Sequence, residues 1–316
     1  MKDGVHTGRA AATVLMLVSM AVAGSTQGLV PAPPAPTFRA SVDLVSVAAV
    51  VRDRRGQVVR DLGREDFEVF DNGVRRPIIE FTPSDDGPIS LALLVDVSGS
   101  MVMTRHLEAA RAWVGILLDR LRPDIDEVAL YTFDRELREE RGFGGDPGGL
   151  RATLAGLQPF GVTSLYDAVG DTARRLAART HRRRAILVVT DGFDNASRLT
   201  PAQVSGLASA TDVPVYVMAV KSAVDRVMTR GAEGPDDVSG QMANLAAWTG
   251  GAAFVVSTPA GASVATQQML ADLRHQYLLA FEAAGPVGWR PLDIRLKRRE
   301  LTVRARSGYF VTLPLG

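Results

Sequence analysis

Short apolar runs alternate with amphipathic segments through the middle of the chain. The apolar runs cover residues 91–95, 128–133, 185–189 and 215–220. Such runs are typical of parallel strands that are buried on both faces of a sheet. Apolar residues recur at helical spacing over residues 102–121, 164–179, 238–249 and 264–276. This alternation predicts an α/β fold with a doubly wound, mostly parallel sheet.

The segments on either side of this region have β character. Residues 42–51 are rich in β-branched side chains, residues 67–70 alternate apolar with polar, and D-N-G at residues 71–73 is a strong hairpin signal. Four more strands are predicted near the end of the chain, at residues 277–281, 292–296, 301–305 and 309–313. Because neither set of short strands makes a convincing core alone, we expect the flanking N-terminal and C-terminal β segments to pack together as a small β domain.

The first residues have the pattern of an export signal. Lys2 and Arg9 precede an apolar stretch over residues 10–23, which ends in A-V-A, a possible cleavage site. As a helix this stretch would span about 21 Å, which is too short for a bilayer core of about 30 Å. We therefore expect an exported, periplasmic or extracellular protein without a transmembrane segment after cleavage. An uncleaved anchor or a buried helix is the alternative.

These patterns divide the chain into five predicted parts. They are a signal peptide (1–23), a proline-rich linker (24–37), an N-terminal β segment (38–86), a central α/β domain (87–260), and a C-terminal helix and β segment that packs with the N-terminal one (261–316). Within the central domain, the glycine-rich residues 142–149 lack the spacing and lysine of a P-loop, and we expect a surface loop there.

Composition excludes several classes of function. The 316 residues contain 36 Lys and Arg against 35 Asp and Glu, so the net charge of +1 predicts no nucleic-acid partner. The absence of cysteine excludes disulfides, a thiol nucleophile, cysteine-ligated zinc and a lipoprotein anchor. Only four histidines are present, which provides few ligands for a histidine-rich metal site.

Oxygen-bearing side chains gather at the predicted ends of strands and starts of helices. Asp96, Ser98 and Ser100 follow the first apolar run, Thr163 stands where a helix opens, and Asp191 follows another apolar run. Ligands of open α/β sheets bind at the carboxyl ends of the strands, so we expect these side chains to converge there. Carboxylate and hydroxyl oxygens suit Mg²⁺, or Mn²⁺ or Ca²⁺. The alternative is that these residues only cap helices and form turns.

The motifs D-V-S-G-S-M, T-S-L-Y-D-A and T-D-G together resemble the von Willebrand factor type A (VWA) domain, over about residues 87–260. The metal-ion-dependent adhesion site (MIDAS) of that family combines D-x-S-x-S with a threonine and an aspartate, which correspond to the five residues named above. The resemblance implies a bound divalent metal and a protein partner that offers an Asp or Glu carboxylate to it.

The flanking segments extend this resemblance. The sequence V-R-D-R-R-G-Q-V-V-R-D-L before the domain, with R-H-Q-Y-L-L-A-F and V-R-A-R-S-G-Y-F after it, looks like a bacterial, acidobacterial-type VWFA-related family, over roughly residues 40–312. The resemblance to that family provides no biochemical function that can be carried over to this chain.

The residues favour binding over catalysis. A serine hydrolase would need a G-x-S-x-G turn around Ser98 or Ser100, and a phosphatase of the haloacid dehalogenase type would need a second carboxylate in place of Ser98. We therefore predict that the protein is not an enzyme, and that it binds protein partners through a divalent metal. The alternative is a structural envelope protein or a regulatory subunit whose metal site is not used for adhesion.

Overall fold

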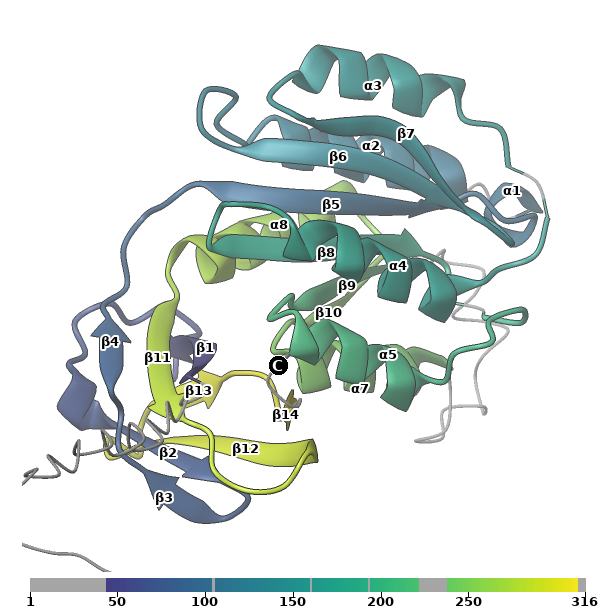
Figure 1. Cartoon of the computed structure of the whole chain (residues 1–316). Helices are drawn as coiled ribbons and strands as arrows, with labels where there is room; N and C mark the ends of the chain where they lie inside the picture. The colour runs from purple at the N-terminus through teal and green to yellow at the C-terminus, as the bar shows by residue number, and fades with distance from the viewer. Residues whose placement is uncertain (1–43, 104–105, 160, 193, 222–237, 312–316) are drawn as a thin grey trace, which may run out of the picture. The chain divides into compact units, whose positions relative to one another are not determined.

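The central part of the computed structural model is a six-stranded sheet with helices on both faces (Figure 1). The structure describes residues 44–103, 106–159, 161–192, 194–221 and 238–311. The sheet has the strand order β10-β9-β8-β5-β6-β7, and only β7 pairs antiparallel to its neighbour. Its strands are β5 (Ile89–Asp96), β6 (Glu127–Phe133), β7 (Leu137–Gly144), β8 (Arg183–Thr190), β9 (Val215–Val220) and β10 (Ala253–Val256).

The helices confirm the predicted doubly wound α/β class. They are α1 (Ser100–Met103), α2 (His106–Leu118), α3 (Pro147–Gly156), α4 (Leu165–Ala177), α5 (Pro201–Ala210), α7 (Val238–Thr249) and α8 (Pro259–Arg274). Two of the predicted segments differ from the structure. The segment 102–121 is divided between α1 and α2, and α8 begins before residue 260, where the central domain was expected to end.

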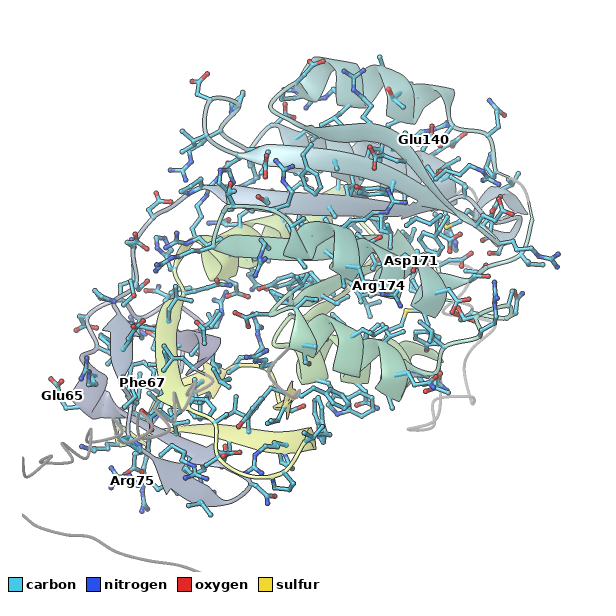
Figure 2. The ribbon with its side chains drawn as sticks, in the orientation of Figure 1. Glu65, Phe67, Arg75, Glu140, Asp171 and Arg174 are labelled. Atoms are coloured by element: carbon cyan, nitrogen blue, oxygen red, sulfur yellow. The ribbon has the colours of Figure 1, made fainter. Side chains whose placement is uncertain are left out.

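The predicted surface loop over residues 142–149 is wrong. Residues 142–144 end strand β7, and α3 begins at Pro147. Strand β7 escaped prediction because it is a polar edge strand, with side chains such as Glu140 exposed (Figure 2). Asp146 caps α3 by accepting a hydrogen bond from the backbone N–H of Gly149 at 3.0 Å, so Gly148 and Gly149 belong to the first turn of that helix.

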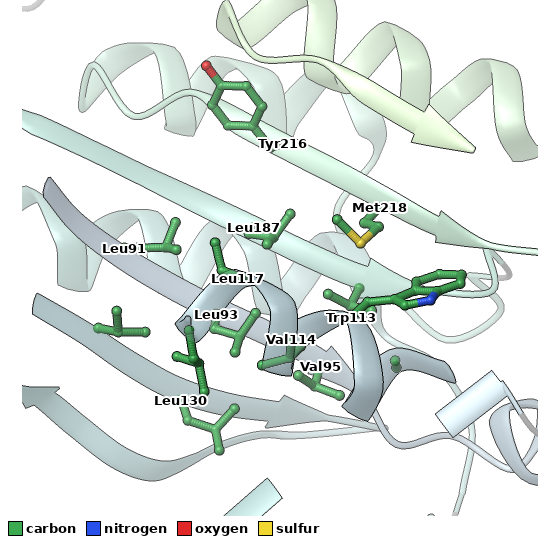
Figure 3. Packing of buried hydrophobic residues seen from close by; sticks show 14 of the residues in the cluster. Leu91, Leu93, Val95, Trp113, Val114, Leu117, Leu130, Leu187, Tyr216 and Met218 are labelled. Atoms are coloured by element: carbon green, nitrogen blue, oxygen red, sulfur yellow. The ribbon is translucent and has the colours of Figure 1, made fainter. Parts of the chain in front are cut away.

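Strand β5 divides the interior of this domain into two hydrophobic cores. Leu91, Leu93 and Val95 point to one face and pack in a cluster with α2, α3 and α8 (Figure 3). Ala92 and Leu94 point to the other face and pack with α4, α5 and α7. Because successive side chains of a strand alternate between faces, a strand with helices on both sides must be apolar at every position. This explains the uninterrupted apolar runs in the sequence.

The N-terminal and C-terminal strands share two antiparallel four-stranded sheets, ordered β13-β1-β11-β4 and β14-β12-β2-β3. The strands are β1 (Leu44–Arg52), β2 (Phe67–Asp71), β3 (Val74–Arg76), β4 (Glu80–Thr82), β11 (Tyr277–Glu282), β12 (Gly288–Leu296), β13 (Thr302–Arg304) and β14 (Gly308–Val311), and a 3₁₀ turn, η1 (Arg64–Asp66), precedes β2. One hydrophobic cluster joins strands of both sheets, and its rings include Phe67 and Tyr277, 5.1 Å apart. We call these eight strands the β sandwich.

The predicted hairpin at D-N-G connects β2 to β3. Asn72 and Gly73 both have positive φ, 49° and 79°, as the tight turn between twisted antiparallel strands requires. The predicted signal peptide and linker lie outside the described residues. Within the part of the chain that is described, no helix combines the length and the apolar character needed to cross a membrane.

Candidate metal centre

Two neighbouring strands bring the first candidate residues together. Strands β5 and β8 run parallel in register, with Val95 opposite Val189. The next residues, Asp96 and Thr190, therefore lie side by side at the carboxyl edge of the sheet, and Asp191 follows directly. This is the edge at which open α/β sheets bind their ligands.

Hydrogen bonds hold the carboxylate of Asp96 at both oxygens. Its Oδ1 accepts from the backbone N–H of Ser98 at 2.8 Å, and its Oδ2 accepts from the hydroxyl of Thr190 at 2.6 Å. The hydroxyl oxygens of Ser98 and Ser100 lie 3.0 Å apart. The loop after β5 therefore folds back on the carboxylate and gathers three oxygen-bearing side chains.

A backbone contact joins the loop that carries Thr163 to this group. The N–H of Gly99 donates to the carbonyl of Gly161 at 3.1 Å, and Gly161 has a φ of 95°, which favours glycine. Asn195 then clamps Thr163, because its Oδ1 accepts from the Thr163 N–H at 3.0 Å and its own N–H donates to the Thr163 carbonyl at 3.1 Å. The loop of Thr163 is thus joined to the loop after β5 through Gly161, while direct contacts link Asp96, Ser98 and Ser100.

The candidate residues are almost fully withdrawn from solvent. Asp96, Ser98, Thr163 and Asp191 are at most 3% exposed, and Ser100 is half-buried. Burial raises the pKa of Asp96 to about 6, against the hydrogen bonds from Thr190 and Ser98 that lower it, and the nearby charge of Asp191 raises it further. Two buried carboxylates therefore repel one another at this edge of the sheet.

The two oxygens of the Asp191 carboxylate differ in their polar neighbours. Within the described residues, Oδ1 of Asp191 is buried without a hydrogen-bond partner, and neither Asp191 nor Asp96 forms an ion pair with a lysine or an arginine. Oδ2 of Asp191 lies 3.6 Å from Nδ1 of His106, which is itself 4% exposed. Buried charge without a counter-ion is costly, so the arrangement favours a cation at Oδ1.

The donor chemistry fits a hard divalent ion. Among the described residues, no three or more His, Asp or Glu side chains come together as a metal site. A cation at this edge would therefore depend on hydroxyl oxygens as well as on two carboxylates, and such an oxygen set suits Mg²⁺ and its relatives. That the five side chains bind a metal stays a prediction.

Two contributors to the site were not recognised from the sequence. Thr190 could have been found, because it directly precedes Asp191 at the end of an apolar run. His106 carries no comparable signal, because it is one polar side chain among the buried apolar residues of a helix.

Residues 91–193 match the family model of the von Willebrand factor type A domain. The chain contains a von Willebrand factor type A domain. The match covers about a third of the chain, begins within β5, and includes all five candidate residues of the metal centre. It confirms, for this region, the resemblance seen in the three motifs. Among curated proteins, none matches the sequence.

Several solved structures are similar to this chain. BatB from Bacteroides thetaiotaomicron is 19% identical, with 57% of this chain and 96% of that chain covered and a TM-score of 0.47. A von Willebrand factor type A protein from Catenulispora acidiphila is 13% identical, with 87% of this chain and 74% of that chain covered and a TM-score of 0.48. Proximal thread matrix protein 1 from the mussel byssus, with a zinc-occupied MIDAS motif, is 16% identical. The match covers 66% of this chain and 50% of that chain, with a TM-score of 0.49.

Proposed function

We propose that the VWA domain binds a divalent cation at the carboxyl edge of its sheet and, through that cation, a protein partner. The observation that carries this proposal is the buried Oδ1 of Asp191, which has no hydrogen-bond partner among the described residues and lies in the same site as the buried carboxylate of Asp96. A cation would offset both charges at once. No lysine or arginine of the described residues does so.

In this proposal the two carboxylates supply the charge, and the hydroxyls of Ser98, Ser100 and Thr163 supply neutral oxygen ligands. Mg²⁺ is the first choice, with Mn²⁺ or Ca²⁺ as alternatives, because all three prefer oxygen. The bound cation would polarise whatever occupies its remaining coordination positions, and a partner's Asp or Glu carboxylate suits such a position. We propose a binding protein and not an enzyme, and export is proposed from the predicted signal peptide.

Wild-type protein is expected to bind Mg²⁺ and Mn²⁺, and Asp191→Asn to bind both more than about 100-fold more weakly. The reason is that loss of a mere supporting residue already costs metal sites about 10- to 100-fold in affinity. Isothermal titration calorimetry measures this directly. The matched control is Asp171→Asn, on the outer surface of α4, where Asp171 is paired with Arg174 (Figure 2). Equal affinity in all three proteins would remove Asp191 from the site.

Partner capture is expected to depend on both the metal and the site. Immobilised wild-type protein should retain specific envelope proteins in Mg²⁺ and release them when a chelator is added, because the partner's carboxylate would bind to the cation. Asp191→Asn should retain none of these proteins, whereas Asp171→Asn should behave as wild type. Identical capture with and without chelator, measured by mass spectrometry of the eluates, would contradict metal-dependent binding.

A further inference from the structure

We infer that His106 is a positioning residue, which orients Asp191 so that one carboxylate oxygen remains for the cation. The inference rests on the proposed function. His106 lies in the first turn of α2 and is 4% exposed. Its Nδ1 is 3.6 Å from Oδ2 of Asp191, while Oδ1 of the same carboxylate is buried and has no hydrogen-bond partner within the described residues. The two oxygens of Asp191 therefore have different surroundings.

The neighbouring carboxylate shows why Asp191 needs such a contact. Both oxygens of Asp96 accept hydrogen bonds from the protein, one from Ser98 and one from Thr190, so its orientation is set by the fold. For Asp191, the described residues provide one polar side chain at ion-pair distance, His106. His106 thus lies beside Asp191 as Thr190 lies beside Asp96, but at a longer distance, 3.6 Å against 2.6 Å.

The position of His106 on its helix supports a polar role. The other buried residues of α2 are all apolar: Leu107, Ala110, Trp113, Val114, Leu117 and Leu118. An imidazole in such surroundings is costly unless its nitrogen serves a polar group. In metal sites, groups that orient a ligand are worth about 10- to 100-fold in metal affinity. A direct nitrogen ligand is less well supported, because His106, Asp96 and Asp191 do not form a three-ligand metal group within the described residues.

Two variants of similar shape test this role in the full-length chain. His106→Asn keeps an N–H donor close to the position of Nδ1, whereas His106→Leu fills a similar volume without a donor. We expect the leucine variant to bind Mg²⁺ about 10- to 100-fold more weakly and the asparagine variant to recover most of that affinity. In chelator, thermal unfolding should show the leucine variant at least as stable as the asparagine variant. A residue that only packs the core would give the same order of stability but no difference in Mg²⁺ affinity, so the affinity decides between the two roles.

The outcomes separate this role from the proposed function. Equal Mg²⁺ affinity in wild type and His106→Leu would overturn the role of His106 and leave the metal site in place. A loss in His106→Leu that is far larger for Zn²⁺ than for Mg²⁺ would also overturn it, because that selectivity is the mark of a nitrogen ligand. A wild-type protein that binds neither cation would overturn the proposed function itself, and with it the role of His106.

Discussion

Replacing Asp272 with alanine is expected to lower the free energy of unfolding by about 3 kcal/mol. Asp272 lies on α8, its side chain is 1% exposed, and it accepts hydrogen bonds from two arginines of the β sandwich. Breaking a buried ion pair from one side costs about 3–5 kcal/mol, because the remaining charge stays buried without its partner. We place the effect at the low end because the side chains of Arg52 and Arg304 are 20% and 30% exposed.

This cluster connects the β sandwich to the VWA domain. Arg52 ends β1 and donates through Nε to Asp272 at 3.1 Å, and Arg304 ends β13, the strand next to β1. Arg304 also donates to the carbonyl of Gly250 at 3.2 Å, and its guanidinium lies 5.8 Å from the ring centre of Tyr216 on β9. Residues from α8, β9 and two sandwich strands therefore meet at one carboxylate, and its loss should weaken the connection between them.

Urea unfolding, followed by far-ultraviolet circular dichroism, measures the effect. The matched control is Asp293→Ala, which removes an exposed carboxylate paired with Arg295 and should change stability by less than about 0.5 kcal/mol. We expect one transition for the wild type, and this transition should broaden or divide in two if the β sandwich and the VWA domain uncouple. Coincident unfolding curves for wild type and Asp272→Ala would show that the cluster contributes no stability.

The parts of the fold that the sequence predicted are those with a local signal. Strands β5, β6, β8 and β9 are apolar at nearly every position because both of their faces are covered, and the motif around Asp96 follows such a strand directly. Strand β7 has no such signal, since a polar edge strand resembles a loop in its composition. The helix predicted over residues 102–121 is too long at its C-terminal end. Leu121 continues the apolar helical spacing and is buried, but it lies beyond the end of α2.

Contacts between residues far apart in the sequence could not be predicted in this way. Arg52 and Asp272 are separated by 220 positions, and nothing in either local pattern indicates the other. The same holds for His106 and Asp191. Tertiary packing alone selects which histidine of the chain faces a carboxylate, so a residue that supports the candidate site could be found only in the structure.

In chelator, we expect the stability of Asp96→Asn relative to the wild type to rise by about 2.4 kcal/mol between pH 4 and pH 8. Burial raises the pKa of Asp96 from 3.8 to about 6 in the folded protein, and each pKa unit corresponds to about 1.4 kcal/mol. Below pH 3.8 the carboxyl is neutral in both the folded and unfolded states. Between pH 3.8 and about 6 the unfolded chain ionises this carboxyl while the folded protein keeps it protonated, so the wild type loses stability that the variant keeps, and above about 6 the loss is complete.

Mg²⁺ should cancel most or all of this difference. At pH 8 a cation held at 100 times its dissociation constant stabilises the folded wild type by about 2.7 kcal/mol, whereas Asp96→Asn lacks one of the two charges that attract it. Asparagine suits the cavity, because it can accept from Ser98 and donate to Thr190 where Asp96 accepts from both. Asp171→Asn should show neither the pH effect nor the loss of the Mg²⁺ effect. Thermal unfolding across pH, with and without Mg²⁺, measures the pH effect and the Mg²⁺ effect. A stability difference between wild type and Asp96→Asn that changes with neither pH nor Mg²⁺ would mean that Asp96 only caps its loop.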